Sequence, residues 1–184
     1  MLQSEVGAPP GTQTAPVLFA GVAVAAIAII ANAWSQWQSA RIANALQGLQ
    51  TLRTDREYLI NADVVRREIE RASDSQWGAP LGASLRRKFS AKGSLGGVDH
   101  PSFRDASFFI LNQYEFLAAG VRSGAIDLVL VDKTLRGPLA NLLMIYSEEI
   151  AHMRRGSPRT FENLIWLHRT LSGSTKPYLG PKSF

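Results

Sequence analysis

The sequence contains no cysteine and, between Val6 and Ala40, no charged residue. The first absence excludes disulfides, thiolate chemistry, and zinc or iron–sulfur centres held by cysteine. The second leaves an N-terminal region that is neutral throughout, while nearly all of the charge lies after it, beginning with Arg41. With 184 residues, the chain is long enough for one domain with appendages.

The charge-free region contains an apolar run from Pro16 to Trp34, interrupted by one asparagine. As a helix this run would be about 27 Å long, close to the hydrocarbon thickness of a bilayer. Trp34 and Trp37 fall where an interfacial aromatic belt is expected. The run predicts a transmembrane helix over residues 16–37, preceded by a disordered tail over residues 1–15.

Three alternatives to a membrane span remain open. A buried core helix would need a second helix apolar enough to cover it, and the sequence offers none. A cleaved signal peptide is suggested by Ala31-Asn32-Ala33, although no Lys or Arg precedes the run. An interfacial helix would need a polar face, which the run lacks.

The flanking charges give the predicted span an orientation. Glu5 precedes it, whereas Arg41 and two further arginines follow it. Because Lys and Arg are enriched on the cytoplasmic side, we expect a single pass through the bacterial inner membrane, with the N-terminus outside and the C-terminal part in the cytoplasm. Trp34, Trp37 and Arg41 would then lie at the membrane interface.

Beyond the span, the pattern predicts a juxtamembrane helix over residues 38–73. Ile42, Leu46, Leu49 and Leu52 recur at intervals of three or four residues, as on one helix face. The repeat is too short to indicate a coiled coil. This apolar stripe must be buried against the C-terminal helices or against a partner.

A linker rich in Gly and Pro is expected over residues 74–104. It contains a basic cluster, whose charged members are Arg86, Arg87, Lys88 and Lys92. These side chains would contact anionic lipid head groups or a partner, or would simply be solvated in a loop, and the sequence leaves both interpretations open. Nucleic acid is an unexpected partner, despite a net charge of +5, because no recognisable binding module is present.

The C-terminal part, residues 105–172, has clear helix punctuation and is followed by a tail over residues 173–184. Caps and breakers predict four helices, over 106–123, 127–136, 139–154 and 158–172, with Gly137-Pro138 ending the second. The predicted fold class is therefore all-α, with a long juxtamembrane helix and a small C-terminal bundle of about four helices.

The runs 109–116 (FILNQYEF), 120–127 (GVRSGAID) and 161–167 resemble the DUF4760 family of uncharacterised, mainly bacterial proteins. The resemblance covers roughly residues 105–170. It implies an N-terminal membrane helix, a charged helix and a helical unit, but no activity. The polar positions that match the family are Asn112, Tyr114, Glu115 and Arg122.

Glu115 and Arg122 are seven residues apart, which places them two turns apart on one face of a helix. A buried structural network with other helices is favoured over a ligand site for this pair. Glu149 and His152 have the Glu-x-x-His spacing of di-iron bundles, but a second such motif is missing. No catalytic, cofactor-binding or metal-binding residues are therefore assigned.

These observations lead to two main hypotheses about function. The first is a non-enzymatic, membrane-anchored accessory or scaffold subunit of a larger integral-membrane protein complex, such as a respiratory or photosynthetic one, with homo-oligomerisation as a further option. The alternative is a membrane-tethered regulator or defence-type effector that binds nucleic acid or nucleotide through a basic cytoplasmic surface. A hydrolase or metalloprotein is the third possibility.

Overall fold

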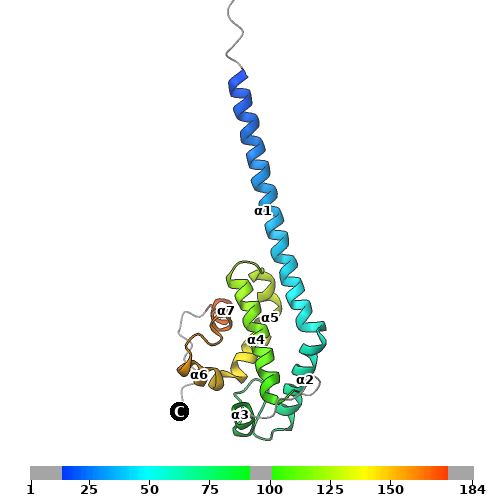
Figure 1. Ribbon diagram of the computed structural model, residues 1–184, viewed down its shortest axis with the longest axis vertical. Coiled ribbons are helices and arrows are strands. Elements are labelled where there is room, and N and C mark those ends of the chain that lie inside the picture. Colours follow the sequence, from blue (N-terminus) through cyan, green and yellow to red (C-terminus); the bar gives the residue numbers. More distant parts are fainter. Residues whose placement is uncertain (1–13, 92–100, 174–184) are drawn as a thin grey trace, which may run out of the picture. The chain divides into compact units, whose positions relative to one another are not determined.

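The computed structural model describes residues 14–91 and 101–173, with side chains from Ala26 onwards except that of Arg53. In these ranges all regular structure is α-helical, which confirms the predicted all-α class (Figure 1). The helices are α1 (Thr14–Thr54), α2 (Arg56–Arg71), α3 (Ala83–Ser90), α4 (Phe103–Arg122), α5 (Leu128–Ile145), α6 (Ser147–Gly156) and α7 (Glu162–Ser172).

The chain divides into two units, residues 1–40 and residues 41–184. In the first unit, the described side chains of α1 are exposed, except for a half-buried Gln38. Within the described ranges, no helix combines the length and the apolarity that crossing a bilayer requires. Polar residues recur in α1 from Asn32 onwards, and a span needs about 20 predominantly apolar residues.

This finding corrects the predicted transmembrane helix over residues 16–37 and the single-pass localisation in the bacterial inner membrane. The interface role expected for Trp34, Trp37 and Arg41 loses its basis with it. The side chains of residues 16–25 lie outside the described residues. So do residues 1–13 of the predicted N-terminal tail and residues 174–184 of the predicted C-terminal tail.

The second unit is built around α4. This helix packs against α2, α3 and α7, and it lies between α2 and α7 in Figure 1. Its sequence explains this position, because its buried residues recur at intervals of three and four and form one broad stripe from Phe103 to Val121. The stripe of α2 is narrower and consists of Asn61, Val65 and Ile69, at intervals of four residues.

The C-terminal part of α1 also belongs to the second unit. Ala45, Leu49 and Leu52 are buried there. Ile42 and Leu46, which the sequence pattern placed in the same buried stripe, are about half exposed. The reason is that Ala45 lies at the centre of the buried face, so the face is turned by one residue relative to the pattern of large apolar side chains.

Two further features differ from the sequence-based prediction. A helix, α3, forms inside the predicted linker and buries Leu85 and Phe89. Gly137-Pro138 does not break α5, which continues to Ile145. Leu135, Leu139 and Leu143 form one buried stripe across the proline, and burying this stripe outweighs the hydrogen bond that Pro138 cannot donate.

The helix instead ends at Tyr146, which is fully buried. Its hydroxyl donates to Ser107 Oγ of α4 at 2.8 Å, and Ser107 in turn donates to the Phe103 carbonyl at 2.7 Å. The backbone carbonyl of Ile145 accepts from the Leu81 N–H at 3.0 Å. The break between α5 and α6 is therefore fixed by contacts with segments far away in the sequence.

Candidate interaction surfaces

Glu115 joins α4 to the first turn of α7. Its Oε1 atom accepts from the Asn163 backbone N–H at 3.2 Å and from Asn163 Nδ2 at 2.8 Å. Its Oε2 atom accepts from the Leu164 N–H at 2.7 Å. The first N–H groups of a helix have no intrahelical partner, so a carboxylate from another helix satisfies them and also complements the positive end of the helix dipole.

Arg122, two turns further along α4, contacts the same end of α7 from the solvent side. Its Nη1 atom donates to Glu162 Oε1 at 3.0 Å and to Asn163 Oδ1 at 3.1 Å. Its guanidinium also lies over the Trp166 ring, 5.8 Å from the centroid. The predicted network of Glu115 and Arg122 with another helix is thus present, although the Arg122 part is exposed and adds little to stability.

The other two polar positions of the family-like run lie elsewhere. Asn112 is exposed. Tyr114 is buried and its hydroxyl is hydrogen-bonded to that of Tyr58 on α2. Burial is the main cause that raises the pKa of Tyr114, and the neighbouring Tyr58 is the second. The four positions therefore do not form one site, because successive residues of a helix point in different directions.

Arg41 ties α1 to the turn between α4 and α5. Its guanidinium lies 3.6 Å from the Asp127 carboxylate, and its backbone carbonyl accepts from the Asp127 N–H at 3.3 Å. Asn44 Nδ2 donates to the Ala125 carbonyl at 3.0 Å, one turn further along. Asp127 also caps α5 through the Leu130 N–H. Arg41 thus has a structural role within the second unit.

The basic cluster lies on α3 rather than in a loop. Arg86 pairs with Glu148 of α6, and Lys88 pairs with Glu68 of α2. Arg87 is exposed, and Lys92 lies outside the described residues. Two charges of the cluster are thus paired with carboxylates from neighbouring helices.

The Glu-x-x-His pair does not form a metal centre in the part of the chain that the structure describes. No group of three His, Asp or Glu side chains is close enough there to hold an ion. Glu149 is buried, its Oε2 atom has no hydrogen-bond partner among the residues that the structure describes, and burial raises its pKa. His152 is exposed and its Nδ1 atom lies 2.7 Å from Arg155.

The first unit carries a row of exposed apolar side chains on α1. Ile27, Ile30, Trp34 and Trp37 follow one another at intervals of three, four and three residues, so they lie on one side of the helix. All four are exposed, and the two tryptophan rings contact each other with centroids 5.1 Å apart. We call these four residues the α1 apolar face.

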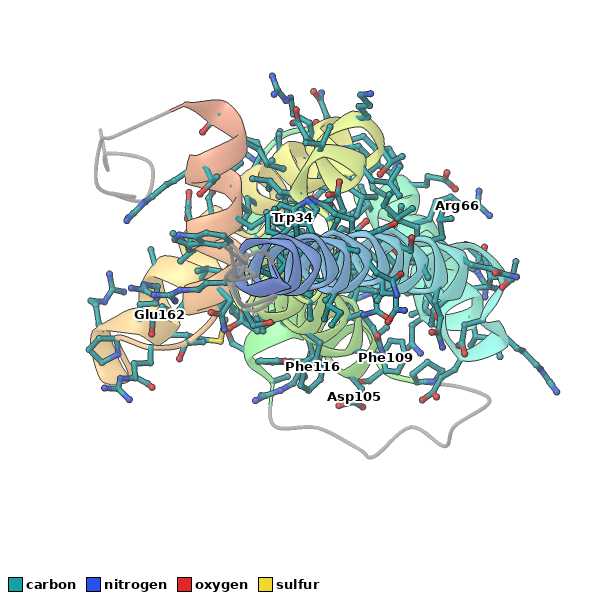
Figure 2. All side chains as sticks on the ribbon, turned by 90° about the horizontal axis from the view of Figure 1, so that it is seen from above. Trp34, Arg66, Asp105, Phe109, Phe116 and Glu162 are labelled. Carbon is teal, nitrogen blue, oxygen red and sulfur yellow. The ribbon has the colours of Figure 1, made fainter. Side chains whose placement is uncertain are left out.

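A smaller exposed apolar position lies on α4 in the second unit. Phe116 is 73% exposed, although it is one of the residues in the family-like run. Figure 2 shows Phe116 and Phe109 on the same side of α4 as Asp105, and Asn112 lies between the two phenylalanines in the helical spacing. This row alternates polar and apolar residues and is shorter than the α1 apolar face.

The family model described as "Domain of unknown function (DUF4760)" matches residues 15–171. The chain belongs to this family. The match confirms the resemblance read from residues 105–170, and it extends to α1, α2 and α3, which carry no recognised motif. No curated protein and no solved structure matches the chain.

In this DUF4760 chain, sequence reasoning identified Glu115 and Arg122 but missed the groups that they bind. Asn163 is 48 residues from Glu115, and no local pattern connects them. It also missed the roles of Asp127 and Ser107. Asp127 caps α5, and its pairing with Arg41 depends on how α1 packs, which the sequence does not reveal.

Proposed function

We propose that the protein is a non-enzymatic accessory or scaffold subunit of a larger protein assembly, and that it works through protein–protein contact at the α1 apolar face. The observation that carries the proposal is this face itself, with two isoleucines and two tryptophans exposed on one side of a helix. Exposed aromatic residues of this kind are typical anchors of protein interfaces, because they bury much surface at small entropic cost.

The second unit supports this proposal because several of its polar side chains bind other parts of the same unit. Glu115, Arg41 and Arg86 each connect two helices or a helix and a turn. Such contacts hold a small bundle in one arrangement. A bundle held in one arrangement is suitable for a subunit that positions other proteins.

No specific observation favours the alternative of nucleic-acid or nucleotide binding. The basic residues on α3 are paired with Glu148 and Glu68. Phosphate binding would have to compete with these carboxylates. We therefore propose the scaffold function alone.

Site-specific photo-cross-linking in cells tests the proposal. A photoreactive amino acid replaces Ile30, on the face, or Ile29, which points to another side of α1. The two isoleucines are a matched pair because they are 68% and 69% exposed. We expect discrete protein adducts from position 30 and few from position 29. Equal yields at the two positions, or no protein adduct at position 30, would contradict the proposal.

A further inference from the structure

We infer that the α1 apolar face pairs with the same face of a second copy of this chain, with the two helices antiparallel. The inference rests on the proposed function and names the partner. Its first support is the spacing of the face, three, four and three residues between Ile27, Ile30, Trp34 and Trp37. This spacing is the same when it is read in either direction along the helix.

Antiparallel pairing uses this symmetry. It places Ile27 opposite Trp37 of the second copy, and Ile30 opposite Trp34 of the second copy. Each large indole then meets a smaller branched side chain, which is how closely packed interfaces fill space. Parallel pairing would instead place each residue of the face opposite the same residue of the second copy. The end with tryptophan opposite tryptophan would be crowded, and the end with isoleucine opposite isoleucine would be poorly filled.

Charge also favours a second copy in this orientation. Because no charged residue lies between Val6 and Ala40, two copies of the face bring no like charges together. The first charge beyond the face is that of Arg41. In an antiparallel pair centred on the face, the two Arg41 residues, each paired with its own Asp127, lie roughly 27 Å apart along the helix axis, beyond the screening length at physiological salt.

The area available is enough for a specific contact. Ile27 and Ile30 are each about two-thirds exposed, and Trp34 is 59% and Trp37 44% exposed. The exposed parts of these side chains on two copies sum to roughly 1,000 Å², about the lower limit for a specific protein interface. Two copies of the face therefore reach this limit when the pairing covers their exposed surfaces fully.

Sedimentation equilibrium of the full chain tests the pairing. We expect a dimer that dissociates on dilution, with a dissociation constant raised at least about tenfold by Trp34→Ala. Ile29→Ala is the matched control for Ile30→Ala, because alanine preserves the helix at both sites. Only Ile30→Ala should weaken the dimer. A monomeric wild-type chain, or equal effects of the two isoleucine variants, would overturn the inference.

The absence of cysteine allows the orientation to be tested in cells, whatever the behaviour of the purified chain. One copy carries Ile30→Cys and a second, differently tagged copy carries Trp34→Cys, and a short bis-maleimide is added. Antiparallel pairing predicts more of the mixed product than of either self-linked product. A dominant self-linked product, or none of the three, would overturn the inference. Adducts from position 30 to a different protein would overturn it as well, but would leave the proposed function standing.

Discussion

Phe161, the residue before α7, has a left-handed backbone (φ 51°) and gives the helix no side-chain cap of its own. The capping groups come instead from Glu115 on α4, which accepts three hydrogen bonds from Asn163 and Leu164. A single carboxylate thus satisfies the start of α7 and fixes its position on α4. The resemblance to the family pointed to this residue, and the structure gives it a structural reason.

Replacing Glu115 should therefore destabilise the second unit. We expect Glu115→Ala to lower the free energy of unfolding by about 2–3 kcal/mol, because it leaves backbone N–H groups unpaired at a helix start. Glu115→Gln should cost less, since one oxygen remains as an acceptor. Urea denaturation followed by circular dichroism measures both. Glu70→Gln, at an exposed ion pair on α2, is the control and should change stability by less than about 0.5 kcal/mol. Equal losses for Glu115→Ala and the control would refute this role.

Glu149 makes stability depend on pH. Its pKa is raised above the ordinary value of 4.5, chiefly by burial. The folded state therefore binds the proton more tightly than the unfolded state, so the stabilisation is present below the unfolded pKa and is lost as pH rises through the folded pKa. Arg86 lowers the pKa of this carboxyl and Glu148 raises it, both by less than burial does.

The variant Glu149→Gln removes the buried charge. We expect it to be more stable than the wild-type chain at pH 7 and to lose this advantage by about pH 4, where the wild-type carboxyl is protonated in both states. Unfolding midpoints measured between pH 4 and pH 8 give the comparison. A constant difference across this range would show that the titration of Glu149 does not contribute.

At the scale of the elements, α3 depends on residues that come before it in a loop. The Asp74 carboxylate accepts from the Ser84 N–H at 2.9 Å and from the Ser84 hydroxyl at 2.5 Å. Ser75 Oγ accepts from the Gly82 N–H at 3.0 Å. These contacts bring the backbone of Asp74 so close to Gly82 that a Cβ at Gly82 would overlap with the Asp74 carbonyl oxygen.

Gly82→Ala should therefore move α3 or the Asp74 loop. We expect a loss of about 1–3 kcal/mol in the free energy of unfolding, as for an overpacked site. Gly156→Ala is the matched control, because a Cβ at Gly156 meets nothing within 4 Å and alanine is the better helix former. The control should be neutral or more stable by up to about 1 kcal/mol. If both variants behaved alike in thermal denaturation, the close approach would be unimportant.

The elements also show what the sequence was able to predict. Local signals located α4 and α7 within a few residues, because apolar spacing is a property of neighbouring residues. The helix α3 was missed because its cap, Asp74, comes ten residues before Ser84. The end of α5 was misplaced because the choice between Pro138 and Tyr146 depends on the contact between Tyr146 and Ser107, 39 residues apart.

The predicted membrane span was drawn from the length of the apolar run and from the tryptophans and arginines that follow it. In the described helices no segment is long and apolar enough to cross a bilayer, and Asn32, Ser35 and Gln36 interrupt the apolar residues of α1. Glu115 and Arg122 were predicted to bind another helix, but their partners on α7 could not be named. The candidate site in α1 could be found only once exposure was known, because a buried and an exposed apolar stripe have the same spacing.

At the scale of the whole molecule, the two units differ in the kind of side chain that they use. The second unit uses its polar residues to hold helices together, as Arg41 does with Asp127. The first unit offers an uncharged apolar face. If this face is a protein contact, Trp34 and Trp37 must be covered in the assembled protein and uncovered when the assembly dissociates.

Acrylamide quenching of tryptophan fluorescence measures the solvent accessibility of Trp34 and Trp37 most directly. Trp77→Phe and Trp166→Phe leave Trp34 and Trp37 as the only tryptophans of the full chain. In the native assembly we predict weak quenching and blue-shifted emission, with quenching increasing several-fold as dilution dissociates it. Quenching as strong in the assembly as in free tryptophan, unchanged by dilution, would contradict the claim that the α1 apolar face is a protein-contact surface.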